Sequence, residues 1–114
     1  MLSLRLYMLQ RLSALVLAPL VVGHLALMIY AIQGGLSVDE ILSRTRGSVA
    51  WFLFYGSFVL AVSIHGAIGV CTIAHEWFSL KGGALEAIMW LFGLLLLGLG
   101  SLAVWAVTFG VGAP

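Results

Sequence analysis

Residues 49–76 read VAWFLFYGSFVLAVSIHGAIGVCTIAHE, and this stretch decides the fold. Its only acidic or basic side chain, histidine aside, is Glu76 at the very end. A helix needs ~20 consecutive apolar residues to cross a bilayer, so the stretch is long enough to span one. An ionisable side chain inside a bilayer is costly and is kept for a function, which directs attention to His65 within the span.

Two further stretches lack charged side chains, residues 12–38 and 87–114. Only 8% of the 114 residues are charged and 63% are hydrophobic, which excludes a soluble domain with a charged surface. The sequence therefore predicts an all-α integral membrane bundle that packs with a second subunit. We expect one transmembrane domain over residues 1–114, with spans at about 10–33, 49–76 and 86–110.

The basic residues predict the orientation. Three of them fall on one side of the predicted bundle and two on the other, namely Arg5, Arg11 and Lys81 against Arg44 and Arg46. Because lysine and arginine favour the cytoplasmic side, we expect a cytoplasmic N-terminus in a bacterial or archaeal cytoplasmic membrane. The net charge of +1 implies no nucleic-acid partner.

One face of the second span carries His65, Gly69, Thr72 and Glu76, because residues four, seven and eleven positions apart share a helix face. A glycine one turn from the histidine leaves room for a flat group such as a porphyrin edge, and Gly66 adds to this clearance. The pattern is also typical of a close helix–helix crossing. For His65, holding a haem iron is the leading function, and a proton or quinone path is the next.

The first span repeats this arrangement with Ser13 and His24, which are also eleven positions apart. Pro19 lies inside the span and should bend it. Ser13 and Glu76 are both expected at the cytoplasmic edge, so His24 and His65 should each lie ~16 Å above that edge, at similar depth. The alternative for His24 is a structural histidine that is bonded to a carbonyl one turn back.

A third group of residues lies where the second span leaves the bilayer. Glu76 can reach water there, while the Trp77 ring sits at headgroup level. Arg11 and Ser13, predicted at the same edge, can donate to a carbonyl oxygen. These residues indicate either an interfacial anchor or a proton-handling site for a lipid-soluble redox carrier.

Three short motifs carry a family resemblance. The first span begins with Gln10-Arg11-Leu12-Ser13-Ala14, the second contains His65-Gly-Ala-Ile-Gly69-Val, and Glu76-Trp77 follow. In one family, the first helix starts with a similar Arg-x-[Ser/Thr]-[Gly/Ala] motif. The second helix of that family carries a His-x-x-x-Gly motif whose histidine ligates haem, and an Asp-Tyr pair follows at the quinone pocket. This family is the small cytochrome b-type membrane-anchor subunits of succinate dehydrogenase and fumarate reductase. Trp77 replaces the family's tyrosine, so an indole N–H would have to substitute for the phenol.

The resemblance implies one or two haem b groups shared with a second membrane-anchor subunit. His65 would be an axial ligand beside Gly69, with the opposite ligand from the partner. His24 stands thirteen residues after Arg11, where two-haem relatives carry the ligand of their second haem. The residues that would border a quinone are Arg11, Ser13, Glu76 and Trp77.

The implied function is electron transport in the respiratory chain and the tricarboxylic acid cycle. The chain would pass electrons between an iron–sulfur subunit and the membrane quinone pool, and would not be catalytic alone. A flavoprotein subunit would hold the dicarboxylate chemistry, since this chain has no glycine-rich nucleotide loop and no cysteine cluster. The alternatives are a haem-free anchor that docks a soluble oxidoreductase and shapes a quinone pocket, or a small proton-translocation subunit.

Overall fold

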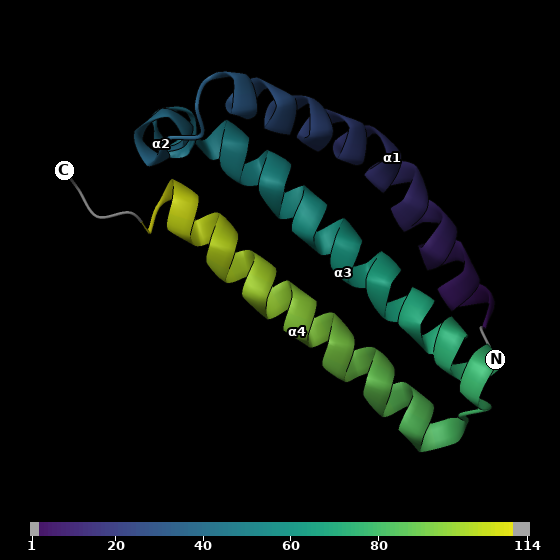
Figure 1. Ribbon diagram of the computed structural model, residues 1–114. Coiled ribbons are helices and arrows are strands. Elements are labelled where there is room, and N and C mark those ends of the chain that lie inside the picture. Colours follow the sequence, from purple (N-terminus) through teal and green to yellow (C-terminus); the bar gives the residue numbers. More distant parts are fainter. Residues whose placement is uncertain (1–2, 111–114) are drawn as a thin grey trace.

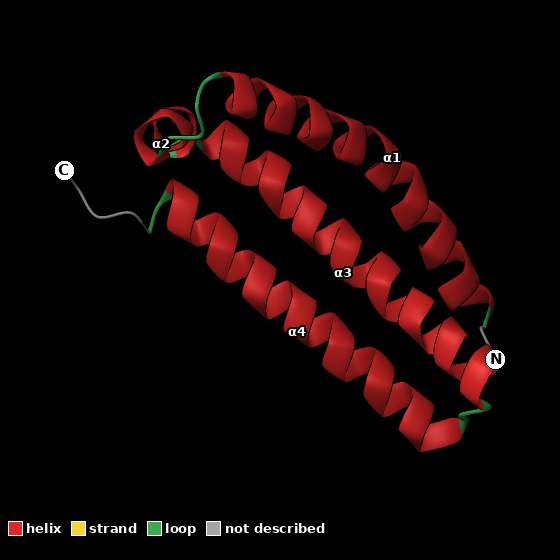
Figure 2. Ribbon diagram, viewed as in Figure 1, coloured by secondary structure: helices red, strands yellow, loops and turns green. Residues whose placement is uncertain are grey.

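The computed structural model describes residues 3–110, so the ends of the predicted domain 1–114 lie outside the described residues. Figure 2 shows that the described chain is helical apart from short connections and contains no strand. Three of its helices are long and apolar enough to cross a bilayer, which confirms the predicted all-α bundle and marks the chain as an integral membrane protein. The helices are α1 (Leu4–Gln33), α2 (Val38–Thr45), α3 (Val49–Phe78) and α4 (Gly82–Thr108).

α3 is the central helix, with α1 packed on one side and α4 on the other (Figure 1). α1 and α3 run antiparallel, so the start of α1 lies near the end of α3. α1 is visibly curved and contains Pro19, whose missing N–H weakens the helix on that turn, as the sequence predicts. Residues 79–81 connect α3 to α4 at one end of the pair. At the other end the Gly47 N–H donates to the Thr108 carbonyl over 2.7 Å.

Three of the helices have a serine as the N-cap residue, directly before the first helical residue. Each serine hydroxyl accepts a hydrogen bond from the backbone N–H three residues later, which satisfies a donor that the first turn leaves free. The pairs are Ser3 with Leu6, Ser37 with Glu40 and Ser48 with Trp51, at 3.3, 3.1 and 3.2 Å. α3 ends at Phe78, and the next residue, Ser79, adopts a left-handed backbone conformation with φ of 56° that turns the chain towards α4.

α2 is a short helix that the sequence patterns did not predict. It is amphipathic, with Asp39 and Glu40 in its first turn and Arg44 in its last. This order places negative charge at the helix N-terminus and positive charge at the C-terminus, where each is favoured by the helix dipole. Arg44 also approaches Glu40 at 3.8 Å and lies 5.3 Å from the centre of the Tyr30 ring. The contact of Arg44 with Tyr30 joins α2 to the end of α1.

The interior of the bundle is built from small side chains. The buried residues of α3 are almost all alanine, serine or cysteine: Ala61, Ser63, Ala67, Ile68, Cys71 and Ala74. Large apolar side chains such as Leu15, Leu91 and Leu102 lie mostly exposed instead. Helices in a bilayer gain their packing energy from close approach of small residues, because lipid solvates large apolar groups well. The distribution is therefore that of a membrane bundle.

Two helices begin before the residues at which the spans were predicted to start. α1 starts at Leu4 rather than near residue 10, and α4 starts at Gly82 rather than near residue 86. The prediction placed the span ends at charged residues, whereas Arg5 and Arg11 lie within α1 as exposed side chains. Long basic side chains can extend towards water from within a helix, so they do not end it.

Candidate functional site

His65 lies on α3 and contacts α1 through Ser13. The two side chains approach at 3.4 Å between His65 Nδ1 and Ser13 Oγ. Ser13 is only 6% exposed, while His65 is half-buried. The Ser13 hydroxyl donates its single proton to the Gln10 carbonyl over 3.0 Å, so its oxygen is left to accept from His65. A His65 ring that is protonated on Nδ1 can donate to this oxygen, and its Nε2 would then carry a free lone pair.

Gln10 completes a small polar patch between α1 and α3, which we call the His65 cluster: Gln10, Ser13, His65 and Gly69. The Gln10 side-chain oxygen is buried and has no hydrogen-bond partner among the described residues. A Cβ placed on Gly69 would lie 3.6 Å from Gln10 Nε2, so the amide covers this glycine. A buried polar atom without a partner is uncommon in a folded chain, and it shows that the cluster retains unused hydrogen-bonding capacity.

Gly66 does not leave the expected clearance for a flat group. Gly66 faces α4, where an added Cβ would lie 3.1 Å from Leu96 Cδ1 and 3.5 Å from Phe92. The prediction that Gly66 opens space beside His65 is therefore wrong. At Gly69 the neighbour is the Gln10 amide of α1, at an ordinary contact distance. Both glycines serve close helix packing.

His24 and His65 do not lie at the same depth. His24 packs edge-on against Phe58 and Tyr55, with ring centres 5.1 and 6.4 Å away. These residues precede His65 by seven and ten positions on α3, which separates the levels by about 10–15 Å at ~1.5 Å per residue. The predicted shared depth is wrong because α1 begins at Leu4, so Ser13 lies well inside the helix and not at its edge.

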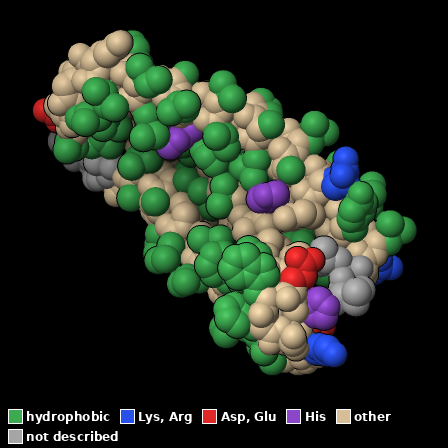
Figure 3. All heavy atoms as spheres, turned by 45° about the vertical axis from the view of Figure 1, so that its right-hand side comes forward, with side chains coloured by type: hydrophobic (Ala, Val, Ile, Leu, Met, Phe, Trp, Pro, Cys, Tyr) green, Lys and Arg blue, Asp and Glu red, His purple; other side chains and the backbone are tan. Residues whose placement is uncertain are grey.

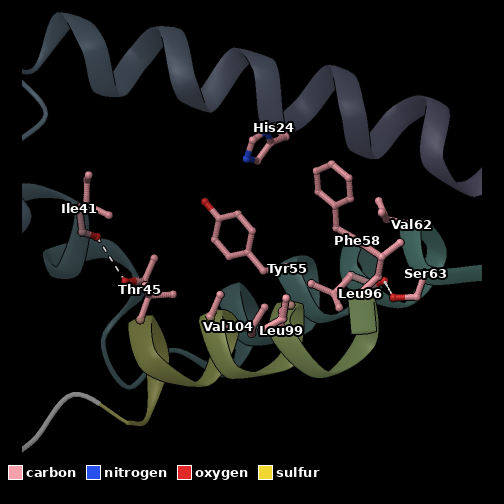
Figure 4. A pocket seen from close by; sticks show the side chains of 14 residues that line it. His24, Ile41, Thr45, Tyr55, Phe58, Val62, Ser63, Leu96, Leu99 and Val104 are labelled. Carbon is pink, nitrogen blue, oxygen red and sulfur yellow. Dashed lines mark hydrogen bonds between the residues drawn. The ribbon is translucent and has the colours of Figure 1, made fainter. Parts of the chain in front are cut away.

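A cavity of about 500 Å³ lies next to His24. Its walls come mainly from apolar side chains of α3 and α4, and Ile41 and Thr45 of α2 line one end. Figure 4 shows His24 reaching down from α1 above Tyr55 and Phe58. The volume falls within the ~300–1,000 Å³ of typical small-molecule pockets. Sequence reasoning missed Tyr55, whose signal is a phenol among apolar residues near the start of a span.

The four residues predicted to border a quinone do not come together within this chain. Ser13 faces His65, eleven positions from Glu76 along α3. Arg11 is exposed and lies over Tyr7, 5.7 Å from the ring centre, with a 3.4 Å hydrogen bond to the phenol oxygen. Glu76 is exposed, and Trp77 is 77% exposed. The prediction that Ser13 and Glu76 share one edge is therefore wrong.

The face in Figure 3 shows how the polar groups are distributed. Histidine side chains lie along this face among hydrophobic ones, and the visible basic side chains gather towards one end. His75 is near the end of α3, where its Nδ1 lies 2.9 Å from the Leu80 carbonyl oxygen. This bond ties the ring to the turn after α3, so His75 has a local structural role.

The described residues contain no group of three or more histidine, cysteine or acidic side chains that could hold a metal ion. A metal bound to this chain would therefore need most of its ligands from elsewhere. A porphyrin supplies four nitrogens and needs one or two axial ligands. His65 fits that requirement with Nδ1 donating to Ser13 Oγ, because metal-ligating histidines generally donate their other N–H to an acceptor.

Comparison with known proteins finds no matching protein family, no matching curated protein and no matching solved structure. The class of protein that the fold defines is a three-span all-α membrane bundle. Any functional conclusion therefore rests on the chemistry of the His65 cluster and on the His24 cavity.

Proposed function

We propose that this chain is a haem b- and quinone-binding membrane-anchor subunit of a succinate:quinone oxidoreductase-type complex. The observation that carries the proposal is the position of His65, which is half-buried within a span and has Nδ1 3.4 Å from Ser13 Oγ. A histidine held in this way is prepared to ligate a metal. The motif resemblance around His65 supports the same assignment.

The proposed haem would lie between this chain and a second anchor subunit. No second histidine of the described chain lies beside His65, because His24 packs on Phe58 and His75 is bonded at the end of α3. A second axial ligand would therefore come from the partner. When bound, haem b supplies a one-electron carrier between the iron–sulfur subunit and the quinone pool.

His24 supports a second, separate haem site in this proposal. It lies on an apolar cavity and about 10–15 Å from the level of His65, which is too far for the two histidines to share one iron. Its opposite ligand would also come from the partner. The exposed large side chains of α1 and α4 leave ample surface for that subunit.

For the quinone we propose that this chain supplies one wall of a shared site. Glu76 and Trp77 are exposed near the C-terminal end of α3, and Arg11 is an exposed side chain in the first half of α1. Reduction of a quinone takes up two protons, so a carboxylate that reaches water can pass protons to it. Trp77 can pack on the ring and donate its indole N–H.

The proposal is tested by the optical spectrum of the purified complex. Wild type should give a b-type signal in the reduced-minus-oxidised spectrum and a whole number of haems in a pyridine haemochrome assay. His65→Ala should lose a low-spin haem, while the control His75→Ala should retain it. A haem-free wild-type complex would favour the haem-free anchor, and an unchanged spectrum in His65→Ala would remove His65 as a ligand.

A further inference from the structure

We infer that Ser13 is a positioning residue that fixes which ring nitrogen of His65 carries the proton. This role differs from the quinone contact that the sequence predicted for Ser13, and it deepens the proposed function because a metal ligand must present a free lone pair. Two contacts support this role, because Ser13 Oγ lies 3.4 Å from His65 Nδ1 and 3.0 Å from the Gln10 carbonyl oxygen.

The direction of the hydrogen bonds follows from the backbone of α1. The carbonyl of Gln10 lies one turn before Ser13 and accepts the hydroxyl proton. A serine hydroxyl has one proton and two lone pairs, so Ser13 offers only an acceptor towards α3. Within a span no water competes for the imidazole, so the Nδ1–H form of His65 is the one that satisfies both side chains.

This contact would influence a metal bound at Nε2. An acceptor on the far nitrogen holds the ring plane in one orientation and makes the ligating nitrogen a better electron donor. A better donor stabilises the oxidised metal and lowers its reduction potential. Loss of the Ser13 oxygen should therefore raise the potential of a haem held by His65 and free its ring to rotate.

Ser63 provides a matched control. It is also a buried serine in a span, and its hydroxyl donates to the carbonyl of Val59 over 2.7 Å, four residues back on its own helix. No histidine contact is recorded for it among the described residues. Ser63→Ala therefore removes the same chemistry at the same kind of site without touching the His65 ring, and Ser13→Thr keeps the hydroxyl at the test site.

The first measurement needs no haem. The full chain, labelled with ¹⁵N at histidine and placed in lipid bilayers, reports the protonated ring nitrogen through its ¹⁵N chemical shifts, with His65 assigned from a His65→Gln sample. Wild type, Ser63→Ala and Ser13→Thr should show the Nδ1–H form, and Ser13→Ala should shift towards Nε2–H. An Nε2–H form in wild type, or the same form in Ser13→Ala as in wild type, would overturn the inference.

The second measurement uses the intact complex. Ser13→Ala should keep its haem, raise the midpoint potential and change the low-spin electron paramagnetic resonance spectrum, and Ser13→Thr should restore both. An unchanged midpoint potential and an unchanged spectrum in a haem-loaded Ser13→Ala complex would also overturn the positioning role of Ser13. Absence of haem from the wild-type complex would refute the proposed function alone, because the ¹⁵N measurement would still decide the role of Ser13.

Discussion

Replacing Gly100 by alanine should destabilise the packing of α4 on α3. A Cβ at this position would lie 2.6 and 3.0 Å from the two Cγ atoms of Val59 and 3.3 Å from its Cβ. Carbon atoms in contact are normally 3.5–4.0 Å apart, so about 1 Å of movement is required. Valine is restricted at χ1, and its Cβ is itself too close, so a rotamer change cannot supply that movement. The two helices have to separate locally.

The expected cost is that of overpacking, about 1–3 kcal/mol. Gly98→Ala is the matched control, because an added Cβ there meets nothing within 4 Å. Both variants gain about 0.5–1 kcal/mol from replacing a helical glycine, and this gain cancels in the comparison. Gly100→Ala should therefore be about 1–3 kcal/mol less stable than Gly98→Ala.

The free energy of unfolding can be measured in mixed micelles by adding dodecyl sulfate and following tryptophan fluorescence and circular dichroism. The Val59→Ala and Gly100→Ala double variant completes a cycle, and removal of the two Cγ atoms should recover most of the loss. Equal stability of the two glycine variants would refute the close approach of Gly100 to Val59. So would a cycle with no coupling between the two positions.

Two further predictions concern the proposed cofactors. His24→Leu should lower the number of haems per complex, counted as pyridine haemochrome, without removing the haem assigned to His65; an unchanged count would exclude His24 as a ligand. Glu76→Gln should slow quinone-linked turnover but leave dicarboxylate oxidation with a soluble artificial acceptor intact, because an amide cannot pass on a proton. If both activities fall in parallel, Glu76 stabilises the assembly and the proton-transfer assignment is wrong.

The three spans were predictable because lipid imposes a simple condition on the sequence. A long run without charged side chains can only be a spanning helix here, and each such run became one. The helix ends were less predictable, since Arg5 and Arg11 lie within α1. α2 was missed because eight residues are too few for a periodic pattern, although Ser37 and the charges of its two end turns are helix signals.

For the site, the sequence predicted which residues share a face of one helix, but not which residues of two helices meet. The eleven-residue spacing gives the face on which Ser13 and His24 lie, but it says nothing about how far α1 is shifted along α3. That shift depends on tertiary packing, and it placed Ser13 against His65 rather than near Glu76. In the same way, the position of Gly66 beside His65 in sequence did not show that it faces α4.

The helices of this bundle are attached to one another unequally. α3 and α4 are joined by residues 79–81 at one end and by the Gly47–Thr108 hydrogen bond at the other, so they form a hairpin that is fastened at both ends. Among the described residues, α1 is joined to the next helix at its C-terminal end, and its N-terminal half carries Ser13. A subunit that presses on this half of α1 therefore acts on the hydrogen bond of His65 without having to open the hairpin. The helix that is joined to the bundle at one end therefore carries the serine that contacts a histidine of the helix fastened at both ends.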